Sequence, residues 1–309
     1  MPRPTILIDC DPGHDDAMAI VAAARHADLL GITTVHGNAP LARTTANALV
    51  MTQLLGIDTP VHSGADRPLT APARHAPGVH GDSGLDGAAL PPLARRAAST
   101  DAVRFIVDTV RAHQGIWLVA IGPLTNIALA LRAAPALAGA VAGISLMGGS
   151  ATFGNRTPVA EFNVWCDPEA ADIVFGCGAP IIMSGLHLTH QAQATPARIA
   201  AIAAIGTEVS AIVADLLTFY SDRYRGTHRG LAGAPVHDVC AVLALTHPHL
   251  FARRAARVDV ELTGTHTRGM TVVDQRPMRD LPASNVALLD TVDADGLFAA
   301  LTEAVARSG

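Results

Sequence analysis

The chain has 309 residues and no lysine, so all 22 of its basic residues are arginines. A lysine side chain is required for Schiff-base chemistry, for pyridoxal phosphate enzymes and for a Walker-type phosphate loop. The sequence therefore excludes these three classes of enzyme. The bias itself is typical of codon usage in an alanine- and arginine-rich genome.

Cysteine and net positive charge are also scarce. The four cysteines lack Cys-x-x-Cys spacing and nothing before Thr5 resembles a signal peptide, so we expect a reducing, cytoplasmic location. The net charge of −5 and the lack of a basic run argue against nucleic acid or an anionic membrane as a partner. Pro135 and several glycines interrupt the weakly charged segment 133–155, which we interpret as a helix end, a turn and a strand rather than a membrane span.

Apolar segments that predict strands alternate with segments that predict helices, and half of the residues are apolar. The predicted strands are 5–9, 31–36, 116–121, 144–147 and 180–186, and the predicted helices are 16–27, 42–55, 102–113, 126–133 and 168–175. A helical pattern returns at 196–225, and another helix is expected to begin near 235–238. Continuous apolar strands separated by helices predict an α/β fold: a mostly parallel central sheet flanked by helices, in a single domain over residues 1–309.

Polar residues follow the predicted strands at the point where each strand ends. Asp9 and Asp11 follow the first strand, Asn38 the second, residues 122–126 the third, residues 147–149 the fourth and His187 the fifth. Ligands of parallel sheets bind beyond the carboxyl ends of the strands, so we expect these residues to form one polar rim. Residues 63–96 are rich in proline and glycine, and a segment of this length without an evident helix or strand predicts an active-site loop.

Four aspartates lie within residues 9–16, directly after the first predicted strand. Carboxylates held this close in a buried site repel one another unless a cation, arginines or protonation offsets their charge. Oxygen ligands of this kind favour Ca²⁺ or Mg²⁺ over Zn²⁺.

The pattern Asp9-x-Asp11 after an apolar strand also fits a haloacid-dehalogenase-type phosphatase. Those enzymes use a basic residue, usually lysine, to stabilise a phosphoaspartate, and Pro12 and Gly13 stand here where they have a hydroxyl residue. This alternative therefore explains the motif less well than a metal site does.

The longer motif DCDPGHDDA at residues 9–17 resembles the fingerprint of the nucleoside hydrolases of the inosine-uridine-preferring type. Further matches follow in the family's order: TTVHGN at 33–38, GPLTN at 122–126, MGG at 147–149, AEFN at 160–163, VHD at 236–238 and, more weakly, GMT at 269–271. The resemblance implies a calcium-dependent hydrolase that splits ribonucleosides into ribose and free base, for nucleoside salvage. It also implies a homodimer or homotetramer.

The same resemblance assigns a role to individual residues. It implies Ca²⁺ ligation by the side chains of Asp11, Asp16 and Asp238 and by the carbonyl of Thr125. Asp11 would also accept a proton from the attacking water, and His237 would protonate the leaving base, as a group that titrates near neutrality can. The residues expected to contact the substrate are Asp15, Asn38, His80, Met147, Asn155, Glu161, Asn163, Tyr220 and Tyr224.

The preferred base stays open at this stage. His237 and the presence of only two tryptophans disfavour the purine-specific branch, whereas Tyr220 and Tyr224 slightly favour acceptance of purines as well as pyrimidines. Nucleosides are expected over nucleotides, because no phosphate loop or arginine cluster accompanies the motifs. Trp165 is expected to pack in the core. Two alternatives remain: a nucleoside- or ribose-binding homologue without turnover, and a family enzyme that acts on a modified nucleoside or a ribosyl metabolite.

Overall fold

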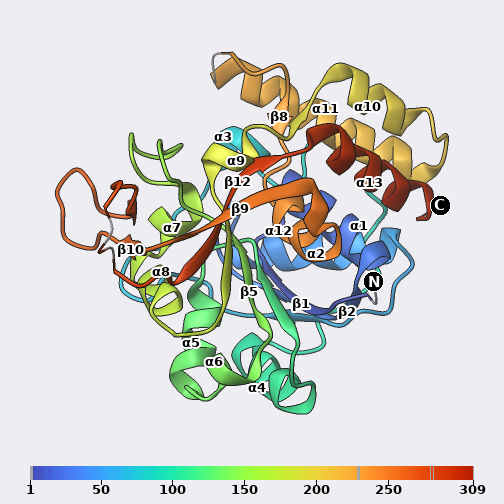
Figure 1. Cartoon of the computed structure of the whole chain (residues 1–309). Coiled ribbons are helices and arrows are strands. Elements are labelled where there is room, and N and C mark those ends of the chain that lie inside the picture. Colours follow the sequence, from blue (N-terminus) through green and yellow to red (C-terminus); the bar gives the residue numbers. More distant parts are fainter. Residues whose placement is uncertain (1–2, 228–229, 279, 281, 309) are drawn as a thin grey trace.

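The computed structural model describes residues 3–227, 230–278, 280 and 282–308 (Figure 1). Its central sheet has eight strands in the order β3-β2-β1-β4-β5-β6-β12-β9. All neighbouring pairs are parallel except β12 and β9, which are antiparallel. These strands are β1 Thr5–Cys10, β2 Asp28–Thr34, β3 Val61–Ser63, β4 Trp117–Ala120, β5 Gly143–Met147, β6 Ile181–Ser184, β9 Phe251–Ala256 and β12 Val286–Val292.

Two short antiparallel pairs lie outside this sheet: β7 Gln193–Ala194 with β8 Ala234–Pro235, and β10 Val258–Val260 with β11 Thr271–Val273. The helices are α1 His14–His26, α2 Leu41–Leu54, α3 Pro77–His80, α4 Ala102–Ala112, α5 Thr125–Ala133, α6 Leu137–Ala140, α7 Phe162–Cys166, α8 Pro168–Phe175, α9 Leu186–Thr189, α10 Pro196–Ala203, α11 Glu208–Thr227, α12 Val239–Thr246, the 3₁₀ helix η1 Pro248–Leu250 and α13 Ala294–Ala306.

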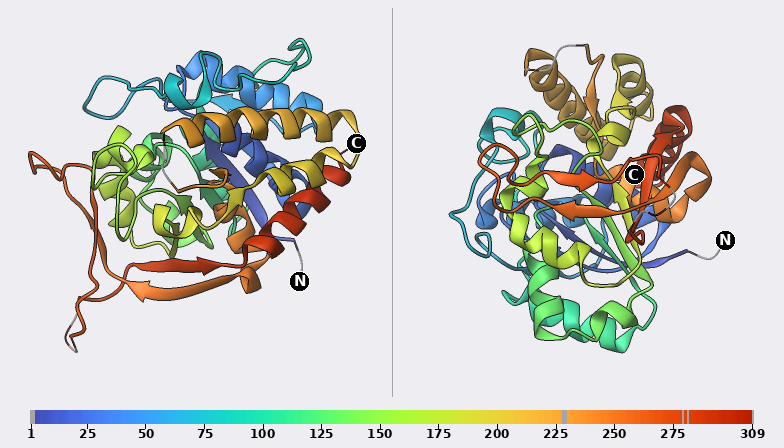
Figure 2. Two further views of the ribbon diagram at one scale, coloured as in Figure 1. Left: turned by 90° about the horizontal axis from the view of Figure 1, so that it is seen from above. Right: turned by 60° about the vertical axis from the view of Figure 1, so that its left-hand side comes forward.

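Helices cover both faces of the sheet (Figures 1 and 2). On one face, Ile6 and Ile8 of β1 pack in a core with α1, α2, α11, α12 and α13. On the other face, Leu7 packs in a second core with α4, α5, α6 and α8. Successive side chains of a strand point to opposite faces, so a strand between two cores must be apolar at every position. The predicted α/β fold with a mostly parallel sheet and flanking helices is confirmed.

The five predicted strands and the five helices predicted between them are present, with ends shifted by a few residues. The helical region 196–225 is two helices, α10 and α11, separated by a turn in which Gly206 has a φ of +80°. The helix expected near 235–238 begins at Val239. Segment 133–155 contains a helix end and the strand β5, as predicted, and the short helix α6 where a turn was expected. No helix among the described residues is long and apolar enough to cross a membrane.

The order of the strands defines where a ligand can bind. The chain moves from β1 to β2 and β3 on one side and then to β4, β5 and β6 on the other, so the order reverses between β1 and β4. Doubly wound sheets open a crevice beyond the carboxyl ends of the strands at such a point. Asp9 and Asp11 lie at the end of β1, and Gly122 lies just beyond β4. Segment 63–96 contains α3 and is tied to the end of β2 by a hydrogen bond from Ala76 N–H to the Asn38 carbonyl.

Candidate active site

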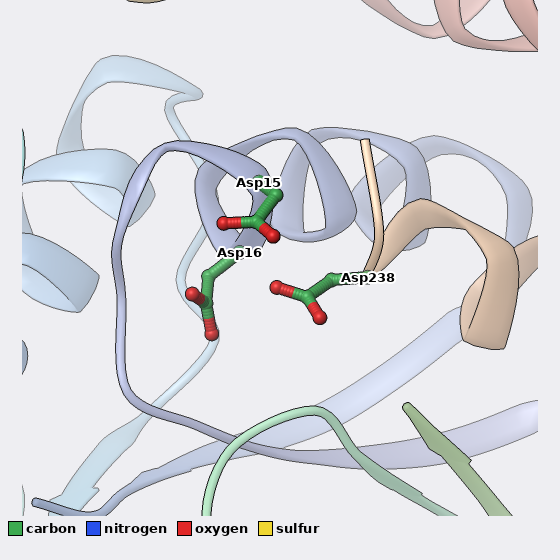
Figure 3. Close-up of side chains that lie close together, drawn as sticks. All are labelled: Asp15, Asp16 and Asp238. Carbon is green, nitrogen blue, oxygen red and sulfur yellow. The ribbon is translucent and has the colours of Figure 1, made fainter. Parts of the chain in front are cut away.

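Three aspartates from distant parts of the chain meet at this crevice. Asp15 and Asp16 extend from the first turn of α1, Asp238 immediately precedes α12, and their carboxylates point toward one another (Figure 3). One oxygen from each lies within 4.8 Å of the other two, and all three residues are buried. A packed contact between α1 and α12 therefore brings the first motif and the VHD motif at 236–238 together.

The turn between β1 and α1 is held by Asp16 and Asn38. Asp16 accepts hydrogen bonds from the main-chain N–H groups of Asp11, at 3.2 Å, and Gly13, at 3.0 Å. The Asn38 side-chain amide donates to Asp16 Oδ2 and to the Asp11 carbonyl, each at 3.1 Å. A carboxylate at the start of a helix is favoured by the helix dipole and by the unpaired N–H groups there.

Asp11 is fully buried beside this group. Its Oδ2 accepts a hydrogen bond of 2.7 Å from Asn38 N–H, whereas its Oδ1 has no partner among the described residues. A Cβ atom at Gly37 would lie 1.9 Å from Asp11 Oδ2, and one at Gly122 would lie 2.5 Å from Oδ1. Both glycines are therefore required by the position of the Asp11 carboxylate. We call Asp11, Asp15, Asp16 and Asp238 the carboxylate cluster.

Burial controls the charge of the carboxylate cluster. It raises the pKa of Asp16 to about 8 and that of Asp15 to about 7, and the charge of Asp15 adds to the shift at Asp16. The pKa values of Asp11 and Asp238 are also raised, first by burial and then by the neighbouring carboxylates. Without a positive charge beside them, these carboxyl groups therefore favour the protonated form more strongly than exposed aspartates do.

The donor set fits a hard divalent cation. Asp11 Oδ1 and Asp15 Oδ1 are buried and have no hydrogen-bond partner among the described residues. Buried carboxylate oxygens without a partner are costly, and a cation would satisfy them. The ligands are oxygen atoms only, which suits Ca²⁺ or Mg²⁺.

A pocket opens above the carboxylate cluster and collects the predicted substrate-binding residues. Its lining includes all of them: Asp15, Asn38, His80, Met147, Asn155, Glu161, Asn163, Tyr220 and Tyr224. His237 and Asp238 line the pocket as well. The structure thus brings the predicted binding and proton-donor residues to one place.

One side of the pocket is formed by residues 147–163. Glu161 is buried and accepts hydrogen bonds from the main-chain N–H groups of Gly149, Asn163 and Val164 at 2.8–3.2 Å. Asn163 donates to the carbonyls of Ile121 and Met147, which follow β4 and end β5. These bonds fix the side chains before a ligand enters. Burial raises the pKa of Glu161 to about 7.

The other side is aromatic. Tyr220 and Tyr224, one turn apart on α11, pack edge to face with ring centres 5.1 Å apart. The Tyr224 hydroxyl lies 2.8 Å from His237 Nε2, and Thr189 Oγ1 lies 2.7 Å from His237 Nδ1. Both ring nitrogens of His237 are therefore held in place.

His80 enters this side from the 63–96 segment. Its ring stacks on Tyr220 and on His14, which is the first residue of α1. Burial lowers the pKa of His14 to about 4, and burial together with the neighbouring His14 lowers the pKa of His80 well below its ordinary value. We call His14, His80, Tyr220, Tyr224 and His237 the aromatic cluster.

Some residues at the strand ends do not line the pocket. Asp9 accepts hydrogen bonds from Thr33 and Asn126 and so connects β1 to β2 and α5. It does not line the pocket, which argues against a phosphatase with Asp9 as the nucleophile. His187 contacts Ala151 N–H and the Leu289 carbonyl, so it supports the fold. The predicted ligand Thr125 is buried at the start of α5, and its hydroxyl donates to Asp167.

Trp165 was expected in the core, and this expectation is wrong. The residue is half-buried, and the guanidinium groups of Arg74 and Arg156 lie 4.0 and 4.8 Å from the centre of its ring. The two guanidinium groups therefore pack on the Trp165 ring as cation–π contacts.

Comparison with known proteins identifies the family. Residues 6–299 match the family model described as inosine-uridine preferring nucleoside hydrolase. The chain belongs to this family. This nucleoside hydrolase is 42% identical over 308 residues to the pyrimidine-specific ribonucleoside hydrolase RihB of Escherichia coli K12, an alignment that covers 99% of this chain and 98% of RihB.

Solved nucleoside hydrolases share the fold throughout. A purine-preferring ribonucleoside hydrolase from Gardnerella vaginalis is 32% identical, with a TM-score of 0.91 and coverage of 98% of both chains. A plant nucleoside hydrolase, PpNRh1, is also 32% identical, with a TM-score of 0.90 and coverage of 98% of this chain and 99% of that one. The predicted family and the predicted enzyme class, an N-glycosidase, are confirmed.

Sequence reasoning missed several residues of this nucleoside hydrolase site. Ala76, Val79, Ile121, Arg156 and Phe162 also line the pocket. Thr189, which contacts His237, and His14, which contacts His80, were not singled out. Of these residues, only His14 could have been singled out from the sequence, because it lies inside the first motif. The other residues belong to no motif and have no spacing that indicates a role.

Proposed function

We propose that this enzyme hydrolyses the N-glycosidic bond of pyrimidine ribonucleosides, giving ribose and the free base, with Ca²⁺ bound at the carboxylate cluster. The observation that carries the proposal is one pocket that joins buried, partly unpaired carboxylates to a histidine held by Tyr224 and Thr189. Cleavage of this bond needs stabilisation of a positively charged ribose, activation of water and protonation of the leaving base.

The cation would be held by Asp11, Asp16 and Asp238 with the carbonyl of Thr125. Asp15, the third member of the closest group of carboxylates, lies beside it and faces the pocket. When bound, Ca²⁺ would offset the clustered charge, anchor ribose hydroxyls and polarise the attacking water.

Asp11 would be the general base. Its Oδ2 is occupied by Asn38 N–H, so Oδ1 is the atom left to accept a proton from water. The close approach of Gly37 and Gly122 leaves the carboxylate little room to turn, so its position is fixed before a ligand binds. Fixed geometry of this kind lowers the reorganisation needed in the transition state.

The ribose would be bound by residues on both sides of the pocket: Asp15, Asn38, Asn155, Glu161 and Asn163, with Met147 against the ring. Carboxylate and amide oxygens around the sugar favour the positive charge that develops on it. Glu161 and Asn163 are already held by hydrogen bonds with the main chain, so they lose little side-chain freedom when a substrate binds.

The leaving base would receive its proton from His237. The Tyr224 hydroxyl, 2.8 Å from His237 Nε2, also lines the pocket. A hydroxyl accepts one proton as it donates another, so Tyr224 connects His237 to the base without leaving its place. His80 and Tyr220 would contact the base from the same side.

The pyrimidine preference rests on similarity. RihB, which is named pyrimidine-specific, is 42% identical, whereas the purine-preferring enzyme from Gardnerella vaginalis is 32% identical over similar coverage. We therefore propose a preference for pyrimidines in place of the acceptance of purines that Tyr220 and Tyr224 slightly favoured.

We also propose that residues 1–309 form one cytoplasmic domain that assembles as a homodimer or homotetramer. Strands from both ends of the chain in one sheet support the single domain.

A substrate panel tests the proposal. Release of reducing sugar is measured for uridine, cytidine, inosine and adenosine, with added Ca²⁺ and with a matched chelator control. We expect kcat/KM for uridine or cytidine to exceed that for inosine by about tenfold or more, a difference of about 1.4 kcal/mol. Chelation should suppress all cleavage, and readdition of Ca²⁺ should restore it. Cleavage unaffected by chelation contradicts the metal role, and faster cleavage of inosine contradicts the base preference.

A further inference from the structure

His14 lies in the first motif but has no role in the proposed metal binding, water activation, ribose binding or protonation of the base. It is fully buried as the first residue of α1. Its ring stacks on His80, Phe219 and Tyr220 at centre distances of 5.3–5.4 Å. It therefore joins three segments that are far apart in the sequence: the start of α1, the 63–96 segment and α11.

Two short polar contacts fix the His14 ring. Its Nε2 lies 2.8 Å from the main-chain carbonyl of Asp86, and its Nδ1 lies 3.1 Å from Nδ1 of His80. The Asp86 side chain in turn accepts hydrogen bonds from the N–H groups of Asp82 and Ser83, which holds this part of the segment in a compact turn. His14 thus ties the main chain near residue 86 to the ring that lines the pocket.

The contacts determine where the protons lie in a neutral pair of rings. A carbonyl only accepts hydrogen bonds, so His14 Nε2 must carry its proton. The Nδ1 atom of neutral His14 is then an acceptor, and Nδ1 of His80 must donate to it. In this arrangement the main-chain N–H of His14 cannot donate to His80 Nδ1. That contact, at 3.3 Å, is the longest of the three.

The second nitrogen of His80 is consequently an acceptor. A Cβ at Gly13 would lie 2.6 Å from His80 Nδ1 and 2.8 Å from Cε1, so this edge of the ring packs against the β1–α1 turn. Both hydrogen bonds that the structure gives the His80 ring within the described residues involve Nδ1 rather than Nε2, and His80 lines the pocket. The edge that carries Nε2 is therefore the one available to a ligand.

We infer that His14 is a positioning residue, which orients His80 and fixes its tautomer so that an unprotonated Nε2 faces the substrate. Such an atom binds a ligand group that donates a hydrogen bond, a hydroxyl or an N–H, and repels an acceptor at the same place. The inference rests on the proposed function for the identity of the ligand, but the state of the His80 ring is independent of it.

The test uses the full chain labelled with ¹⁵N-histidine, without substrate, at pH 8, where the ordinary pKa of histidine near 6.5 leaves both rings neutral. Two-bond ¹H–¹⁵N spectra identify the tautomer, and a His80→Asn variant assigns the signals. We expect wild-type His80 to be protonated at Nδ1 only. A signal from His80 protonated at Nε2, or an average of both tautomers, overturns the inference.

Two substitutions extend the test to activity. His14→Phe retains the stacked ring but neither hydrogen bond, whereas His14→Gln retains a donor and an acceptor. We expect His14→Phe to lower kcat/KM for nucleosides by about tenfold or more, with a mixed His80 tautomer, and His14→Gln to stay within about threefold of wild type. The control is His249→Phe at an exposed histidine.

Other outcomes are equally decisive. A His14→Phe variant with normal kcat/KM and an unchanged His80 spectrum overturns the positioning role. If His14→Phe does not fold, the wild-type spectrum and the His14→Gln variant still decide. If the wild-type enzyme cleaves no nucleoside, the proposed function fails, whereas the spectrum of the ligand-free protein still supports or overturns the assignment of the His80 tautomer.

Discussion

The carboxylate cluster and the aromatic cluster face each other across one pocket, but they are built in different ways. Three of the four carboxylates lie within residues 11–16, and only Asp238 comes from elsewhere. The aromatic cluster takes its rings from α1, α3, α11 and the segment before α12. One cluster is therefore largely local in sequence, and the other exists only after the chain has folded.

The two clusters also differ in how far their polar groups find partners within the cluster. The carboxylate cluster leaves Asp11 Oδ1 and Asp15 Oδ1 unpaired and has raised pKa values, so it is incomplete without a cation. The aromatic rings stack on one another and form hydrogen bonds within the cluster. The carboxylate cluster therefore depends on the cation that completes it, whereas the aromatic cluster depends on contacts among its own side chains and faces the base. We therefore expect base preference to vary through the aromatic cluster while the carboxylates stay fixed.

The largest effect is expected from Asp11→Asn. The change keeps the shape of the side chain but removes the base and one ligand, so kcat for uridine should fall by on the order of 10³-fold or more. The same variant removes a buried carboxylate from a repulsive group. Its melting temperature in chelator at pH 8 should therefore exceed that of wild type, since the raised pKa of Asp11 reports an unfavourable charge.

Two measurements check this first expectation, sugar release and thermal unfolding with and without Ca²⁺. Ca²⁺ should stabilise wild type much more than Asp11→Asn. Near-normal turnover in Asp11→Asn contradicts its role as the base. Equal stabilisation of both proteins by Ca²⁺ contradicts its role as a ligand.

The next effect concerns the proton donor of the aromatic cluster. His237→Ala should lower kcat for uridine by about 10²-fold or more, the range for loss of a general acid. Cleavage of p-nitrophenyl riboside should fall much less, because its leaving group needs little protonation. Equal losses on both substrates would remove His237 from the role of proton donor and leave it as a structural partner of Tyr224.

The fold was predictable from the sequence to the extent that apolar segments reveal it. Central strands with an apolar run that reaches both cores, such as β1 with Ile6, Leu7 and Ile8, were predicted. The strand β12 also reaches both cores, through Leu289 on one face and Leu288 on the other, but it was not predicted. The edge strand β9 carries the exposed Arg253 and is covered by no second core, so its pattern does not reveal it. The short pair β10 and β11 is equally hidden, because two strands of three residues each contain too little periodicity.

The site shows the same limit. The carboxylate cluster was predicted because like charges close together in a sequence require a physical explanation. The pairing of His14 with His80 spans 66 residues and that of Thr189 with His237 spans 48, and no spacing rule connects them. Resemblance to a family found His80 and His237, whereas the residues that hold them became visible only in the structure.

A smaller effect should follow when His237 loses one of the partners that hold it. Thr189→Val keeps the size of the side chain and removes the hydroxyl that lies 2.7 Å from His237 Nδ1. We expect kcat for uridine to fall about tenfold, corresponding to one hydrogen bond of about 1.4 kcal/mol. Thr189→Ser, which restores the hydroxyl, should recover most of this loss. If both variants behave alike, packing rather than the hydrogen bond explains the effect.

The smallest expected effect is a pH dependence of the melting temperature that arises from His80 in the aromatic cluster. Burial, and then the neighbouring His14, lower the pKa of His80 in the folded protein below its ordinary value of 6.5. As the pH falls below about 6.5, His80 becomes protonated in the unfolded chain but stays neutral in the folded chain. The free energy of unfolding is therefore unaffected by His80 above pH 6.5 and decreases as the pH falls below it. With Ca²⁺ saturating, the melting temperature of wild type should fall from pH 7.5 to pH 5.5 by a few degrees more than that of His80→Asn. His249→Asn, at an exposed position, serves as the control and should follow wild type. An identical pH dependence in wild type and His80→Asn would mean that His80 accepts its proton without cost in the folded state, and the aromatic cluster would then be less tightly closed around it than its stacked rings indicate.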